Sequence, residues 1–326
     1  MMKKLTALLT ALFLLLSATA LADEVIHIGI IQFAEHGSLD NCRIGFIEGL
    51  AEEGFVEGEN VVFDIQNAQA DTAISAQIAD VMAGKYDMIC AIATPAAMAA
   101  FNAAEDAGIP VIYTAVSDPV SAMLASADGK NPGNITGTSD ALNTSFIMDM
   151  MFAQNPDVAK VGLLYSLSEP NSTKPIADAK AYLDAKGIEY VEQTANTNDE
   201  VVAAASALIA DGVDAVFTPT DNVIMAAELA IYEDLAKAGI PHYTGADSFV
   251  RNGAYATCGV NYTDLGAKTA DLAYSAITDG MDGMEDYYLM DGGIITVNTD
   301  TAAAMSLDYS CFDSMGTVVE VTTTKD

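Results

Sequence analysis

Several signatures of enzymes are absent from this sequence. It has no Gly-x-Ser-x-Gly nucleophile elbow, no Walker phosphate loop and no Gly-x-Gly-x-x-Gly fingerprint, and it holds only three histidines in 326 residues. One histidine without a second ligand makes a poor metal site, so we expect no catalytic residue, metal or cofactor. One enzymatic alternative stays open: Glu35 and His36 could serve as an acid-base pair if both side chains converged on a cleft.

Basic residues are also scarce. The chain has 13 Lys and Arg against 46 Asp and Glu, which gives a formal net charge of −33. Without Lys3 and Lys4, which lie in the segment discussed next, the formal charge becomes −35. So acidic a surface repels phosphate groups, and nucleic acid and anionic membranes are therefore poor partner candidates.

Only the amino terminus carries a long apolar run. Lys3 and Lys4 precede Leu5–Leu16 and the small-x-small triplet Ala20-Leu21-Ala22, which predicts a secretory signal peptide over residues 1–22. The run is shorter than the ~20 residues that cross a bilayer, so a retained anchor is the less favoured alternative. Because the first cysteine is Cys42, no lipid-attachment cysteine follows the cleavage site, and we expect an exported, soluble, periplasmic protein.

Four cysteines in an exported chain permit disulfides, but their positions do not indicate a disulfide scaffold. Cys90 lies in an apolar run, where a buried free thiol is the ordinary interpretation. Cys258 and Cys311 could pair if the carboxyl-terminal tail packs back on its lobe, and the sequence leaves this open.

Apolar runs and amphipathic segments alternate along the chain. Strands without internal alternation have both faces buried, and with helices between them they predict parallel sheets with right-handed crossovers, an α/β fold. The predicted strands cover residues 25–33, 60–66, 88–93, 111–116, 134–139, 160–166, 189–194, 256–260 and 294–297. The predicted helices cover residues 39–53, 71–83, 95–107, 143–154, 174–186, 199–210 and 263–278.

A stretch of the first half returns in degraded form. Residues 87–119 and 214–249 share an apolar run, Thr-Pro, an alanine-rich amphipathic segment, Ala-Gly-Ile-Pro and a second apolar run that ends at aspartate. The repeat predicts two Rossmann-like lobes, each built on an open parallel sheet. Because ligands of such sheets bind beyond the carboxyl ends of the strands, we expect a site in the cleft between the lobes.

Residues at the predicted strand ends differ in charge between the two lobes. Thr94, as a cap followed by proline, would leave the amides of Ala96 and Ala97 free at the positive end of a helix, which suits a carboxylate. Asp221 and Asp247 occupy the matching positions of the second lobe, where an ordinary helix cap and a solvated turn are the plain alternatives.

Opposite charges across a cleft complement a zwitterion such as an amino acid. We expect Thr94, Ala96 and Ser117 to bind the carboxylate, Asp221 and Asp247 to bind the ammonium, and Gln32 and Asn222 to orient the ligand. Phe33 and Phe249 are candidates for an aromatic wall. The predicted ligand-binding set is Gln32, Phe33, Thr94, Ala96, Ser117, Asp118, Asp140, Thr220, Asp221, Asn222 and Asp247.

Five segments carry a resemblance to a known family: IGIIQFAEHGSLD, ATPAAMAAFNAAEDAGIPVIYTAVSDPV, PGNITGTSD, FTPTDN and AGIPHYTG. Together they resemble the periplasmic substrate-binding proteins of ABC importers, in particular the family with tryptophan and phenylalanine binders. The resemblance implies the type I periplasmic-binding (Venus-flytrap) fold, a monomer that closes on a hydrophobic or aromatic amino acid and delivers it to a membrane permease with a separate ATPase.

The same resemblance implies where the lobes begin and end. It places residues 23–139 and 262–292 in the amino-terminal lobe and residues 140–261 and 293–326 in the carboxyl-terminal lobe, with the tail after residue 297 retaining a helix. A sensor module that hands its ligand to a membrane receptor would carry the same sequence features and is the main alternative to an importer subunit. A secreted enzyme on the same scaffold is the second alternative.

Overall fold

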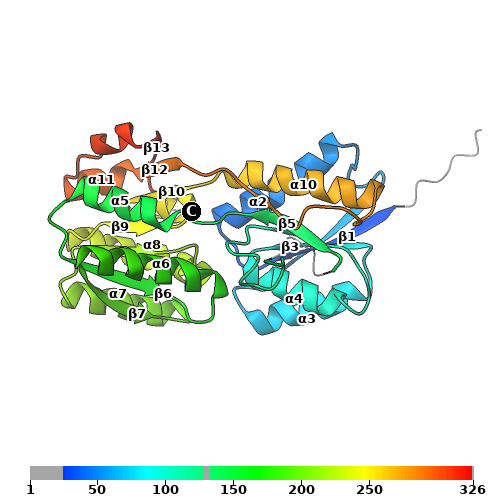
Figure 1. Ribbon diagram of the computed structural model, residues 1–326, viewed down its shortest axis with the longest axis horizontal. Coiled ribbons are helices and arrows are strands. Elements are labelled where there is room, and N and C mark those ends of the chain that lie inside the picture. The colour runs from blue at the N-terminus through cyan, green and yellow to red at the C-terminus, as the bar shows by residue number, and fades with distance from the viewer. Residues whose placement is uncertain (1–24, 128–132, 325–326) are drawn as a thin grey trace, which may run out of the picture.

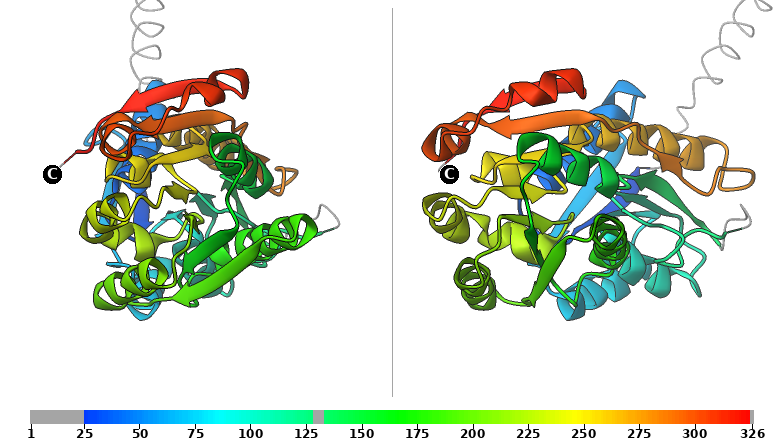
Figure 2. Two further views of the ribbon diagram at one scale, coloured as in Figure 1. Left: turned by 90° about the vertical axis from the view of Figure 1, so that its left-hand side faces the viewer. Right: turned by 60° about the vertical axis from the view of Figure 1, so that its left-hand side comes forward.

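The structure is a computed structural model that describes residues 25–127 and 133–324 (Figure 1). The predicted signal peptide, residues 1–22, lies outside the described residues. Two lobes lie side by side, each built around one sheet, and Figure 2 shows helices on both faces of the sheets. Within the described ranges, no helix has both the length and the apolar character needed to cross a membrane.

The first sheet has the strand order β11-β5-β4-β3-β1-β2, and all its neighbouring strands are parallel. The central strands β1 and β3 are almost completely buried because helices cover both faces, as their unbroken apolar runs predict. The strands are β1 (Ile26–Gln32), β2 (Val61–Asn67), β3 (Met88–Ile92), β4 (Val111–Thr114), β5 (Ile135–Ser139) and β11 (Tyr288–Leu289). The helices that precede or pack on them are α2 (Gly37–Glu52), α3 (Thr72–Ala83), α4 (Thr94–Ala104) and α10 (Tyr262–Thr278).

The second sheet has the order β13-β12-β10-β9-β8-β6-β7, and only the β10–β12 pair is antiparallel. Its strands are β6 (Lys160–Tyr165), β7 (Glu189–Thr194), β8 (Ala215–Thr218), β9 (His242–Thr244), β10 (Ala256–Gly259), β12 (Ile294–Asn298) and β13 (Thr317–Val321). Its helices are α5 (Thr144–Gln154), α6 (Pro170–Lys186), α7 (Asn198–Ala210), α8 (Asn222–Lys237), α9 (Asp247–Arg251) and α11 (Thr299–Met305), with a short 3-10 helix at Ser310–Ser314. The predicted α/β class with two parallel-sheet lobes is confirmed.

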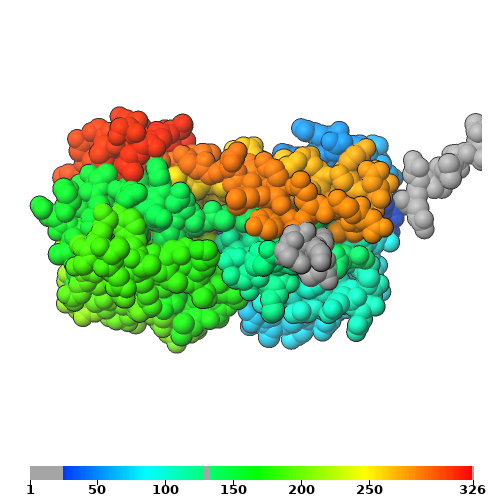
Figure 3. Space-filling model, in the orientation of Figure 1, coloured from blue at the N-terminus to red at the C-terminus, as the bar shows by residue number. Residues whose placement is uncertain are grey.

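The chain passes between the two sheets three times: after β5, between β10 and α10, and between β11 and β12. From the assignment of the strands to the two sheets, we propose the lobe boundaries that the resemblance implied, at residues 139/140, 261/262 and 292/293. Figure 3 shows the lobes meeting along one boundary, with the orange segment before β12 crossing above it.

Helices α2 and α10 pack so closely that only glycine fits between them. A Cβ atom on Gly45 would lie 2.1 Å from the carbonyl oxygen of Thr263, and one on Gly266 would lie 2.1 Å from that of Cys42. Both neighbours are backbone atoms that cannot move aside independently of their helix. The second helix of this pair comes from sequence far downstream, so the first lobe is completed by a segment that follows most of the second lobe.

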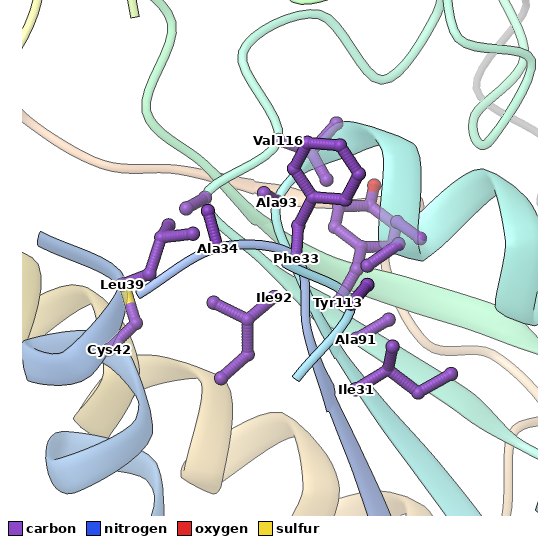
Figure 4. Close-up of a cluster of buried hydrophobic side chains, with 14 of the residues drawn as sticks. Ile31, Phe33, Ala34, Leu39, Cys42, Ala91, Ile92, Ala93, Tyr113 and Val116 are labelled. Atoms are coloured by element: carbon purple, nitrogen blue, oxygen red, sulfur yellow. The ribbon is translucent and has the colours of Figure 1, made fainter. Parts of the chain in front are cut away.

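Figure 4 shows part of the hydrophobic core of the first lobe. Phe33, Tyr113 and Val116 are fully buried there among the strand ends, together with Cys42. Phe33 therefore belongs to the hydrophobic core of the first lobe.

Two local features differ from the sequence-based expectations. Helix α4 begins at Thr94, one residue earlier than predicted, and its N-cap is Ala93, which has no side-chain hydrogen bond. The tail forms a helix and also strand β13, for which no strand was predicted. Cys258 and Cys311 are free, as are the other cysteines, and Cys90 is buried as expected.

Candidate ligand-binding cleft

A small cavity lies between the lobes, where the carboxyl ends of the central strands face each other. Its volume is about 20 Å³, room for little more than one water molecule, so the cleft is closed. Six residues of the predicted set line it: Thr94, Ser117, Asp140, Thr220, Asp221 and Asn222. The structure thus brings strand ends from both lobes to one enclosed site.

On the first-lobe side, the cavity wall is the start of α4. Ala93 has φ 84° and ψ 155°, a conformation that residues other than glycine rarely adopt. The Oγ1 of Thr94 is buried without a hydrogen-bond partner, so this hydroxyl is not the helix cap that the sequence predicted. The amide of Ala97, expected to be free, donates to the carbonyl oxygen of Ala93 at 3.0 Å. The start of α4 nevertheless has no side-chain cap, and its dipole favours a negative group.

The other first-lobe residues of the predicted set do not line the cavity. Gln32 is held within its own lobe: its Nε2 donates to the Ala34 carbonyl (2.8 Å) and to Asp40 (3.0 Å), and its Oε1 accepts from Arg43. The carboxylate of Asp118 accepts from the backbone amide and the hydroxyl of Ser121. Ala96 is buried in the first turn of α4, and Phe33 lies in the core.

On the second-lobe side, Asp221 is the N-cap of α8. Its Oδ1 accepts from the amides of Val223 (3.1 Å) and Ile224 (3.0 Å), and its Oδ2 accepts from the amide of Ser166 and the hydroxyl of Ser172, both at 2.7 Å. Burial raises the pKa of this carboxyl, while the four donors lower it. Because each oxygen already accepts two hydrogen bonds from its own lobe, the carboxylate has little capacity to accept another from a ligand.

Sequence reasoning missed a second buried acid beside Asp221. Glu169, which precedes α6, is 1% exposed, and its Oε2 accepts from Nδ2 of Asn222 at 3.0 Å. Its Oε1 is buried without a partner. Burial and the charge of Asp221 raise the pKa of Glu169 to about 8. The next residue but one, Asn171, lines the cavity and donates to the Thr220 carbonyl, while its Oδ1 is unpartnered.

At two places in the cavity wall, hydrogen bonds cross directly from lobe to lobe. His36 Nε2 lies 3.0 Å from Asn222 Oδ1, and because a carbonyl oxygen can only accept, the His36 nitrogen carries the proton. Ser117 donates to Asp140 at 3.0 Å, which leaves the Thr220 hydroxyl to donate to Ser117 at 2.8 Å.

A third crossing contact involves Ser38, whose hydroxyl lies 2.8 Å from that of Ser248 and 3.3 Å from the carboxylate of Asp247. Asp247 also accepts from Arg251 at 2.9 Å and does not line the cavity. These contacts join the lobes without any intervening group, and they define the closed arrangement.

The base of the cleft lies at the lobe crossings. Asp140 follows the first crossing, and its second carboxylate oxygen accepts from the hydroxyl of Tyr262, which follows the second crossing. Burial raises the pKa of both groups, and that of Tyr262 lies well above its usual range. This pair ties two of the crossings together directly beneath the ligand cavity.

Most cavity-lining residues that the sequence analysis did not select follow a strand or open a helix. They are His36, Ser38, Leu39, Ala93, Ala115, Asn171, Met225, Ala246, Ser248 and Tyr262, and Phe249, named as a possible wall, also lines the cavity. The signal that could have found several of them is position: extending the strand-end rule to the first turn of the following helix includes Ser38, Asn171 and Ser248. The selection missed them because it favoured charged and capping residues.

Comparison with known proteins gives consistent results. The family described as ABC transporter substrate binding protein matches residues 27–307. The chain is 35% identical to the tyrosine-binding protein of Clostridioides difficile strain R20291 over 290 residues, which cover 89% of this chain and 83% of that protein.

Two solved structures of relatives, one with a bound ligand and one ligand-free and open, differ in how well they superpose on this chain. An L-Trp complex from Streptococcus pneumoniae has a TM-score of 0.82 at 28% identity, covering 91% of this chain and 100% of that one. The ligand-free, open structure of a substrate-binding protein with adhesive properties from Clostridium difficile has a TM-score of only 0.68 at 34% identity, covering 92% and 100%. The relative with the higher sequence identity superposes less well, as expected if the lobes of the present chain are closed.

Proposed function

The chain belongs to the family of ABC transporter substrate-binding proteins, and on that premise we propose that it captures an aromatic amino acid in the interlobe cleft. It is a transport binding protein of an ABC system and not an enzyme. Glu35 is exposed and His36 bonds to the opposite lobe, so the acid-base pair considered from the sequence has no common site.

The observation that carries the proposal is the polarity of the closed cavity. The uncapped start of α4 offers a positive potential and the free Thr94 hydroxyl to a carboxylate, whereas the second lobe offers buried acids. The opposite charges of an α-amino acid complement such a pair of walls. The aromatic class is supported by relatives whose names give tyrosine and L-Trp as their ligands.

Thr94 and Ser117 are the proposed carboxylate contacts on the first lobe, with Ala96 contributing through the helix start. Of the two acids expected to bind the ammonium, Asp221 has no free lone pair for a strong further bond, and Asp247 is bonded to Ser38 and Arg251. The ammonium contact is therefore to be sought elsewhere in the second lobe.

The wider role follows from the family. We propose that the mature protein is exported to the periplasm and works as a monomer, and that it delivers its ligand to a membrane permease driven by a separate ATPase. Ligand contacts to both lobes would stabilise the closed form, which the permease would then recognise.

Isothermal titration calorimetry tests the ligand class. We expect L-tyrosine, L-tryptophan or L-phenylalanine to bind, and we expect tyramine and 3-(4-hydroxyphenyl)propionate, which lack the carboxylate and the ammonium respectively, to bind much more weakly. L-Lysine and L-aspartate serve as amino-acid controls with the wrong side chain. Absence of binding by every aromatic and branched-chain amino acid would overturn the proposal.

A further inference from the structure

Three buried acceptor atoms in or next to the cavity wall lack hydrogen-bond partners: Nδ1 of His36 and Oδ1 of Asn171, which both line the cavity, and Oε1 of Glu169, whose other oxygen bonds to the cavity-lining Asn222. The His36 nitrogen is an acceptor because the proton of the neutral ring is on Nε2, where it serves Asn222. Unpaired buried acceptors are costly, and native proteins keep few of them. Three in one region indicate a partner that brings several hydrogen-bond donors.

Glu169 is also a buried acid without a cation. The main influences on it are burial and Asp221, a group of the same charge, and no lysine or arginine of the described residues acts on it. Asp221, its neighbour, differs in having four donors of its own. The side chains of Asn222 and Asn171 and the backbone of Asn222 stabilise the charged form of Glu169, but its Oε1 has no hydrogen-bond partner, whereas both oxygens of Asp221 are occupied.

A cation with several N–H donors would satisfy all three acceptors. An ammonium group has one positive charge and three donors, which matches one carboxyl and two neutral acceptors. The acceptors come from both lobes, since His36 lies on the first lobe and the other two lie on the second, and the side chain of Asn222 bonds to both His36 and Glu169.

We propose that Glu169 is the residue that binds the ligand's ammonium group, with Asn171 and His36 as neutral acceptors, and that this binding displaces a proton from Glu169 into solvent. The proposal rests on the function proposed above and assigns the ammonium site within it. The step is balanced: the protonated carboxyl loses one proton, and the carboxylate that remains pairs with the ammonium.

The ionisation of the surrounding groups supports this direction. Burial, followed by the charge of Asp221, raises the pKa of Glu169 to about 8, so near neutral pH the group holds its proton until a cation arrives. Asp221 and His36 are the other titratable groups beside it, and burial raises the pKa of Asp221. Burial lowers the pKa of His36 and keeps the ring neutral, although Asp40 and Asp247 act in the opposite direction.

Calorimetry of L-tyrosine binding in two buffers of different ionisation enthalpy, phosphate and Tris, measures the displaced proton. At pH 7 we expect release of about 0.9 proton per ligand, the protonated fraction that a pKa of about 8 gives, and about half a proton at pH 8. Heats that do not depend on the buffer at pH 7 would overturn the proposal.

The Glu169→Gln variant identifies the residue. It should abolish the proton release and weaken L-tyrosine binding by about 30-fold or more, while the weak binding of 3-(4-hydroxyphenyl)propionate, which has no ammonium, should change little. Glu228→Gln is the matched control, since Glu228 is a fully buried glutamate of the same lobe that bonds to His242 away from the cavity. Its proton release and affinity should match wild type.

The outcomes separate this inference from the proposed function. Binding of L-tyrosine with neither proton release nor sensitivity to Glu169→Gln overturns the inference alone. Failure of all aromatic and branched-chain amino acids to bind overturns both. The wild-type buffer experiment decides the proton step even if the variant does not fold.

Discussion

The two lobes share one strand-helix arrangement at the cleft, but the helices that begin there, α4 in the first lobe and α8 in the second, differ in their N-terminal caps. In the first lobe α4 begins after Ala93, which provides no side-chain cap. In the second lobe α8 begins after Asp221, whose carboxylate occupies the helix amides and two further donors. A helix start that is already neutralised cannot attract a ligand anion, so the difference supports the proposal that the ligand carboxylate binds to the first lobe.

The two lobes also differ in backbone strain next to the cavity. Ala93 and Ala115 have φ values of 84° and 55° directly after β3 and β4, at the cavity. In the second lobe, the only described non-glycine residue with a positive φ is Ser306, which ends α11 far from the cavity. The first lobe thus shapes its wall with strained backbone, and the second shapes its wall with buried polar side chains.

The largest expected effect is loss of the second-lobe cap. Asp221→Ala should lower the free energy of unfolding by about 3 kcal/mol or more, because four buried donors lose a charged acceptor. Chemical denaturation measures it. The control is Asp71→Ala, which removes an exposed cap with two amide bonds in the first lobe and should cost about 1 kcal/mol. Equal losses would contradict the difference between the lobes.

The second prediction concerns pH. Because the pKa of Glu169 is raised to about 8 from 4.5, its contribution to stability is complete below about pH 4.5 and is lost as the pH rises toward 8. Relative to Glu169→Gln, the wild-type free energy of unfolding should therefore fall by about 2 kcal/mol or more between pH 5 and pH 8. Urea denaturation without ligand at several pH values measures it. Glu53→Gln, at an exposed first-lobe site, should follow wild type, and parallel curves for wild type and Glu169→Gln would refute the prediction.

Thr94 should affect binding without affecting stability. Thr94→Val removes a hydroxyl that is buried and unpaired, so the fold should lose nothing, whereas affinity for the carboxylate ligand should fall by about tenfold. Calorimetry and denaturation together test this. Thr138→Val should show the reverse pattern, because that buried hydroxyl bonds to Thr114 and Thr269 within the lobe.

The smallest effect should be a gain in stability. Ala93→Gly places glycine where φ is 84°, which should stabilise the first lobe by about 1 kcal/mol. Ala100→Gly, a buried position within the same helix, should instead destabilise it by about 1 kcal/mol or more. A loss of stability in Ala93→Gly would show that the strained backbone is not costly.

The fold could be predicted well from the sequence, because the strands of each lobe are continuous apolar runs separated by turn residues. The same rule located Thr94, Ser117 and Thr220, since they directly follow buried strands. The rule failed for Gln32, because its side-chain amide is hydrogen-bonded to Asp40 and Arg43 of the following helix α2. No periodicity in the sequence reveals that contact.

Glu169 was missed for a different reason. It precedes a proline-started helix in a polar segment, where an acid normally faces solvent, and only the approach of Asn222 from a helix more than fifty residues later buries it. Asp221 was found, but its role was misjudged, because the donors from Ser166 and Ser172 also come from a distant part of the chain. The residues at strand ends can be predicted from the sequence. The number of hydrogen bonds that a buried carboxylate accepts cannot, because the donors come from distant parts of the chain.

The glycine-mediated contact between α2 and α10 has a consequence for the order of assembly. The early helix α2 cannot bury its glycine face until a segment beginning at Tyr262 has been synthesised, and by then most of the second lobe has already emerged. Contacts between such distant segments are slow to form, so we expect the nascent first lobe to stay incomplete and loosely packed until α10 has emerged. Delayed compaction of the leading half would keep the polypeptide threadable, a property compatible with the export proposed above.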